Sequence, residues 1–167
     1  MFVSFDTLPD NARIWIYQSD RKFSEKEEDF IQKNLAAFCE QWAAHGAPIK
    51  SSVKVFHSQF IVLAADESFT AASGCSIDGT LRMFQDLEVK LGCTLLNRTQ
   101  IAFFENEEVK LYPQKELKEL FATGILKKSS LAFNNVVAVK SDIQDKWLVP
   151  VENSWINRFL PKDTVAS

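Results

Sequence analysis

Hydrophobic residues recur along the chain with two spacings, one typical of strands and the other typical of helices. Residues 12–18 are rich in aromatic and β-branched side chains, so we expect a strand there. Residues 51–65 have strand composition over a length that exceeds one ordinary strand, which predicts a hairpin turning near 57–59. Residues 101–105 and 109–112 flank a polar turn and predict a second hairpin.

Two long helices are indicated by apolar positions three or four residues apart. Ser24 and Glu27 form a capping box that begins the first helix, and we expect this helix to end at Gly46 in a left-handed conformation. The second helix follows the cysteine segment and should end at Gly92. Its expected apolar face comprises Ile77, Leu81, Phe84, Leu87 and Leu91. A short third helix is expected over 113–122.

The order strand, helix, hairpin, helix, strand predicts an α+β fold, a ferredoxin-like two-layer sandwich (βαββαβ). We expect an added C-terminal strand, the short helix and an irregular tail, all within one domain over 1–167. Strands could lie at 131–133 and 136–139. In this topology the second helix begins on the rim where the first one ends, which brings residues 73–78 close to His45 and Lys50.

Composition and charge narrow the classes of function. The chain has 167 residues and a net charge of −3, which argues against general nucleic-acid binding because that needs a basic surface. No apolar run is long enough to insert into a membrane, and the first residues lack the pattern of an export signal. Three cysteines, an odd number, favour a reducing compartment over a disulfide scaffold, so we expect a cytoplasmic protein.

Residues 73–80 are the candidate site, because they place two glycines, a cysteine and several hydroxyls at a helix start. Unpaired N–H groups and a partial positive charge favour an anion there. Our leading hypothesis is a ligand-binding or regulatory domain for a small anion. Lys50 would pair with the anion and Ser76 would orient it. The predicted ligand-binding residues are His45, Lys50, Ser73, Gly74, Cys75, Ser76 and Asp78.

The same segment leaves alternatives open. Cys75 could be the catalytic nucleophile of a thiol-dependent enzyme, with His45 as its base, because a helix start stabilises a thiolate. Asp78 opposes this hypothesis, because a nearby carboxylate disfavours a thiolate. A further alternative is a structural protein that forms a homodimer through exposed strand edges. The polar residues could also serve only as helix caps.

Nucleotide hydrolysis is not expected from the residues. Gly74 and Gly79 have the interval of a phosphate-binding loop, but Thr80 stands where that motif requires lysine. Two histidines and three scattered cysteines form no metal-ligand motif, and no cofactor is indicated.

Residues 12–19, 74–78 and 133–135, together with Ser154 and Trp155, resemble a family of small uncharacterised bacterial proteins. Its members often carry the label "ABC transporter ATPase", which implies nucleotide binding. The resemblance covers nearly the whole chain and implies no particular catalytic residues.

Overall fold

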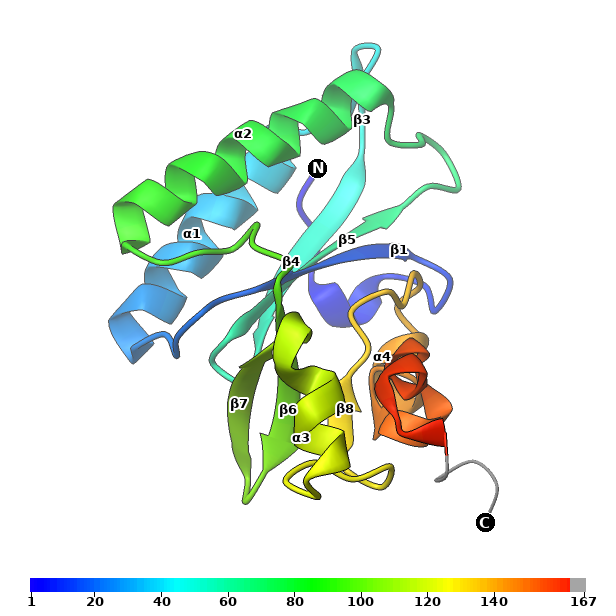
Figure 1. Ribbon diagram of the computed structural model, residues 1–167. Helices are drawn as coiled ribbons and strands as arrows, with labels where there is room; N and C mark the ends of the chain where they lie inside the picture. Colours follow the sequence, from blue (N-terminus) through cyan, green and yellow to red (C-terminus); the bar gives the residue numbers. More distant parts are fainter. Residues whose placement is uncertain (163–167) are drawn as a thin grey trace. The chain divides into compact units, whose positions relative to one another are not determined.

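The computed structural model describes residues 1–162, which form two compact units. Unit 1 comprises Met1–Leu96 and Ala138–Ser141, and unit 2 comprises Asn97–Val137 and the chain from Asp142 onward. Each unit combines helices with antiparallel strands, which confirms the predicted α+β class (Figure 1). The single domain over 1–167 stays a prediction.

Unit 1 is built on a three-stranded sheet in the order β1-β5-β4. Every residue of β5 is buried, and this central strand pairs with β1 on one edge and with β4 on the other. The predicted strand at 12–18 and the hairpin turning at 57–59 are confirmed. The elements of this unit are η1 (Phe5–Thr7), β1 (Arg13–Gln18), α1 (Glu25–Gln41), β2 (Ala43–Ala44), β3 (Ala47–Pro48), β4 (Lys50–Phe56), β5 (Phe60–Asp66) and α2 (Gly74–Leu91).

Helix α1 begins as predicted and ends earlier than predicted. The Ser24 hydroxyl accepts the Glu27 N–H, and the Glu27 carboxylate accepts the Ser24 N–H, so the capping box is confirmed. The helix ends at Gln41, and Gly46 lies instead in the β2–β3 hairpin. His45 and Gly46 both have positive φ, as a two-residue hairpin turn requires. The left-handed glycine was therefore predicted correctly but assigned to the wrong element.

Helix α2 has its predicted cap residues at both ends. Ser73 is the N-cap, and Gly92 is left-handed at the C-terminus. Its buried face confirms Phe84 and Leu87 of the predicted stripe but not Leu81, which is 45% exposed, whereas Ser76 and Thr80 are buried. Each of these two hydroxyls donates to a backbone carbonyl three residues earlier, so burial leaves neither unpaired.

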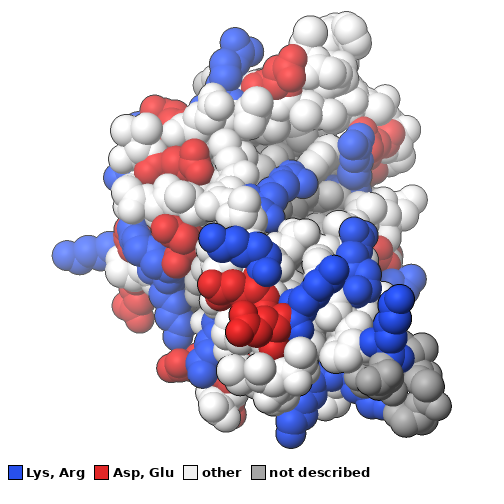
Figure 2. Space-filling model, in the orientation of Figure 1, with Lys and Arg blue, Asp and Glu red and all other residues white. Residues whose placement is uncertain are grey.

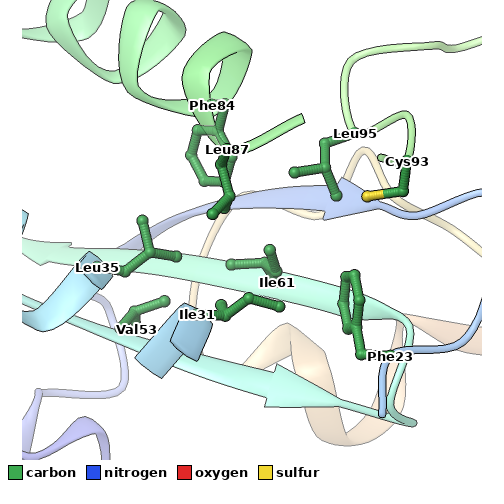
Figure 3. Packing of buried hydrophobic residues seen from close by; sticks show 9 residues of the cluster. All are labelled: Phe23, Ile31, Leu35, Val53, Ile61, Phe84, Leu87, Cys93 and Leu95. Carbon is green, nitrogen blue, oxygen red and sulfur yellow. The ribbon is translucent and has the colours of Figure 1, made fainter. Parts of the chain in front are cut away.

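The core of unit 1 lies between the two long helices and the sheet. Phe84 and Leu87 point from α2 toward the sheet, and Leu35 and Ile31 approach from α1 (Figure 3). Phe84 is fully buried and stacks on Tyr17 of β1, with 3.6 Å between ring centres. Aromatic packing therefore holds α2 on β1.

Arg21 joins the start of α1 to the end of α2. Its guanidinium donates to both Glu27 carboxylate oxygens, at 2.9 and 2.7 Å, and to the Leu91 carbonyl at 2.5 Å. The hydrogen bonds from Arg21 to the carboxylate, with that from the Ser24 backbone, lower the pKa of Glu27 to about 2. A cation at the C-terminus of α2 also complements the helix dipole.

Unit 2 contains a four-stranded sheet in the order β7-β6-β8-β9. Its core packs Phe103 of the sheet with Leu117 and Phe121 of α3 and with Ile156 of η4. The predicted second hairpin, the strand at 131–133 and the short helix before Gly124 are confirmed. The elements are β6 (Gln100–Glu105), β7 (Glu108–Pro113), η2 (Gln114–Glu116), α3 (Leu117–Ala122), β8 (Leu131–Phe133), α4 (Asp142–Asp145), β9 (Leu148–Pro150), η3 (Val151–Asn153) and η4 (Trp155–Phe159).

The ferredoxin-like arrangement is not confirmed, because β6, its expected fourth strand, pairs with β7 and β8. The first three strands do have the predicted order and antiparallel directions. The edge of β1 where a fourth strand would lie is bonded by residues 138–140 instead. The Ile14 N–H donates to the Ala138 carbonyl, and Arg13 forms an isolated bridge with Val139. The strand expected at 136–139 is thus reduced to one bridge.

Candidate functional site

The start of α2 lies beside the end of α1, as the sequence predicted. The indole N–H of Trp42 donates to the Ser76 carbonyl at 3.0 Å, and α2 contacts β2. Trp42 is itself buried and makes an edge-to-face contact with Trp15. The β2–β3 hairpin, which has His45 at its turn, is therefore on the same rim as residues 73–78 (Figure 1).

The two serines of this segment act as helix caps. The Ser73 N–H donates to the Ser76 hydroxyl at 2.7 Å, and the Ser76 N–H donates to the Ser73 hydroxyl at 3.3 Å. Ser76 is buried and its hydroxyl also donates to the Ser73 carbonyl. Gly74 and Cys75, the first two residues of the helix, are exposed. Both serine hydroxyls are thus engaged, and the exposed Gly74 and Cys75 lie at the helix start.

The cation that was expected to hold the anion faces a carboxylate of the protein itself. Lys50 lies opposite Asp66 in the β4–β5 register. Hydrogen bonds from Ser68 and the charge of Lys50 lower the pKa of Asp66, so this carboxylate is ionised at neutral pH. The neighbouring Glu67 carboxylate accepts the Ala72 N–H and pairs with Arg13 on its other side. The exposed Asp78 adds a further negative charge on α2.

The three cysteines differ in exposure. Cys75 is exposed, whereas Cys39 and Cys93 are buried, and burial raises the pKa of both buried thiols. His45 is exposed on its hairpin turn. Among residues 1–162 no hydrogen bond or ion pair joins His45 to Cys75.

A cleft that the sequence did not predict lies in unit 2. It has a volume of about 840 Å³ and is lined by residues 98–100 and 113–116 with Lys118 and Phe159. A volume of this size is within the range of small-molecule sites in proteins. The lining residues lie between Arg98 and Phe159 in the sequence, and none of their segments contains a recognised motif, so only the folded chain brings them together.

Hydrogen bonds at the open end of the β6–β7 hairpin hold two of the segments that line this cleft together. The Thr99 carbonyl accepts the Gln114 N–H at 2.8 Å, and Gln100 lies opposite Pro113 in the register. The Asn97 side chain accepts both the N–H and the hydroxyl of Thr99, which fixes the turn that carries Arg98. The segment before β6 and the segment after β7 are thereby held side by side.

Positive charge dominates the cleft. Arg98, Lys115 and Lys118 line it against one carboxylate, that of Glu116. All four side chains are exposed, and within the described residues 1–162 none of the three cations forms an ion pair. Figure 2 shows Lys and Arg interspersed with Asp and Glu over one face of the molecule. The excess of cations in the cleft is therefore local, because the whole chain is acidic.

Comparison of the chain with family models, with curated proteins and with solved structures gives no match. Over the described part of the chain, residues 1–162, no helix is long and apolar enough to cross a membrane. Within the same residues no three or more His, Cys, Asp or Glu side chains are grouped so that they could hold a metal ion.

Proposed function

We propose that the protein is a cytoplasmic binding protein for a small anionic ligand, and that the cleft of unit 2 holds this ligand. The observation that carries the proposal is the convergence of Arg98, Lys115 and Lys118 on one cleft without ion-pair partners in residues 1–162. Guanidinium and ammonium groups form charge-assisted hydrogen bonds with phosphate and carboxylate. No reaction follows from these residues, so binding is the activity that we propose.

The cleft supports anion binding better than the start of α2 does. At α2 the serine hydroxyls already bond each other, and Lys50 faces the ionised Asp66. Among the described residues that line the cleft there are three cations and one carboxylate, that of Glu116. Because the cations are exposed, solvent weakens each interaction, and we expect an affinity that falls as ionic strength rises.

Paired charge removal tests the proposal. Inorganic phosphate is titrated into the wild-type chain and into the Arg98→Gln/Lys118→Gln variant, with heat of binding measured at constant ionic strength. We expect the variant to lose at least tenfold in affinity. The matched control, Lys127→Gln/Lys128→Gln, removes the same charge from two exposed lysines of unit 2 outside the cleft and should bind as the wild type does. Equal loss in both variants would show only a general charge effect.

A thiol-dependent enzyme is the second candidate, and the exposure of Cys75 at the first turn of α2 favours it. Its test is the rate of alkylation by iodoacetamide as a function of pH, in the wild type and in His45→Gln. A thiolate sustained by His45 would react rapidly below pH 7 and slow down in the variant. If the alkylation rate rises only at about pH 8.5, where an ordinary thiol ionises, this candidate is removed.

The homodimer stays a prediction. Strand β7 is an edge strand of its sheet, but it exposes Glu108 and Lys110, and charges on an edge oppose pairing with a second chain. Light scattering at micromolar concentration distinguishes a monomer from a dimer.

A further inference from the structure

We infer that the ligand of the unit 2 cleft is an organic anion with a planar apolar part, which packs on Phe159 while its charged group faces Arg98, Lys115 and Lys118. This inference rests on the proposed function and adds the chemical class of the ligand. It follows from the size of the cleft and from the composition of its walls.

The cleft has room for a ligand larger than an inorganic anion. Its volume of about 840 Å³ compares with roughly 30 Å³ for one water molecule in the liquid, and phosphate is only a few times larger than water. Small-molecule sites of this size hold ligands with an extended apolar body and a few polar groups. A bound phosphate ion would leave most of the cleft filled with water.

The lining of the cleft includes two apolar side chains, one of which is an aromatic ring. Phe159 and Pro113 both line the cleft and are half-buried. The Phe159 ring makes an edge-to-face contact with Trp155, with 6.0 Å between ring centres and 71° between planes. Aromatic pairs prefer this edge-to-face geometry. The contact with Trp155 therefore restricts rotation of the Phe159 side chain.

A further cation lies beside this ring. The Arg158 guanidinium is 5.1 Å from the Trp155 ring centre and 6.0 Å from that of Phe159. It is exposed and forms no ion pair within residues 1–162. Arg158 does not line the cleft itself, but it adds positive charge next to the ring on which the ligand would pack. The aromatic ring and the cations line the same cleft, which favours a ligand that has both an apolar ring and an anionic group.

Phenyl phosphate and inorganic phosphate are the probes, because they share the charged group and differ by the ring. Each is titrated into the full chain at the same pH and ionic strength. We expect phenyl phosphate to bind about tenfold more tightly, which is the gain that a ring contact commonly provides. In Phe159→Leu this preference should fall about fivefold, with phosphate affinity unchanged. The control Phe30→Leu alters a partly exposed ring of α1 in unit 1 and should change neither affinity.

The outcomes separate the two proposals. If neither probe binds, the proposed function fails and this inference fails with it. If both bind equally, anion binding stands and the inference is wrong. A preference that Phe159→Leu leaves intact also overturns the inference, because the ring then binds elsewhere. Should that variant not fold, nuclear Overhauser contacts between phenyl phosphate and the Phe159 ring of the wild type decide: their presence supports the inference, and their absence at saturation contradicts it.

Discussion

Replacing Glu27 with glutamine isolates the ion pair that joins the start of α1 to the end of α2. The variant removes the charge that Arg21 contacts at 2.9 and 2.7 Å. It keeps an amide oxygen that can still accept the Ser24 N–H of the capping box. We therefore expect a loss that reflects the ion pair and not the helix cap.

The magnitude follows from the pKa of Glu27, which is lowered from 4.5 to about 2, first by the hydrogen bond from Arg21. A shift of that size corresponds to about 3.4 kcal/mol if all of it stabilised the folded state. Solvent reduces this value, because the Arg21 side chain is 39% exposed and that of Glu27 is 25% exposed. We expect Glu27→Gln to lower the free energy of unfolding by about 1 kcal/mol at pH 7.

The pH dependence has a definite sign. Because the folded-state pKa of Glu27 is lowered, its stabilisation is fully present above the unfolded value of 4.5 and is lost as pH falls toward 2. Since the variant does not titrate at this position, the difference from the wild type should shrink by more than about half between pH 5 and pH 3.

Urea unfolding followed by far-ultraviolet circular dichroism measures these differences. Glu28→Gln is the matched control, since it removes a charge from the same first turn of α1 and forms no ion pair within residues 1–162. If Glu27→Gln and Glu28→Gln lose equal stability, or if the Glu27 difference is independent of pH, the reasoning is wrong.

Three further predictions concern unit 1. Trp42→Phe should lower the free energy of unfolding by about 1–3 kcal/mol, because the Ser76 carbonyl loses its indole donor; an unchanged urea midpoint would contradict this. Phe84→Ala should cost about 3–5 kcal/mol, because the fully buried ring stacks on Tyr17, and a loss below about 1 kcal/mol would show that the site can collapse. Ellman's reagent should label Cys75 alone in the folded protein and the two buried thiols only in denaturant; three equivalents reacting at once would refute the assigned burial.

The sequence predicted local structure correctly where a short residue pattern has one structural explanation. The Ser24–Glu27 capping box and the Gly92 cap are of this kind, because each pattern has a single structural explanation. Gly46 has two explanations, since a left-handed glycine ends a helix or turns a hairpin. The two-residue strands β2 and β3 have too few residues to show any alternation, so the sequence favoured the wrong choice.

The remaining errors concern contacts between distant segments. The strand order β1-β5-β4 was predicted correctly. Strand β6, however, pairs with β8 of unit 2, and the local sequence pattern does not specify which distant strand it pairs with. The ligand site at residues 73–80 stays a prediction. Residues 73–80 were conspicuous because their polar residues are consecutive, and two of them prove to be caps. The cations of the unit 2 cleft have no such spacing, and Phe159 joins them only in the folded chain.

The position at which phosphate binds tests the account most directly. In a titration of the isotope-labelled chain with inorganic phosphate, against sodium chloride of equal ionic strength, the backbone amide signals are followed by nuclear magnetic resonance. The account predicts saturable shifts for residues 98–100 and 114–118, with the signals of Gly74 and Cys75 unmoved. Shifts centred on Gly74 and Cys75, with the cleft residues unaffected, would contradict it and return the anion site to the start of α2.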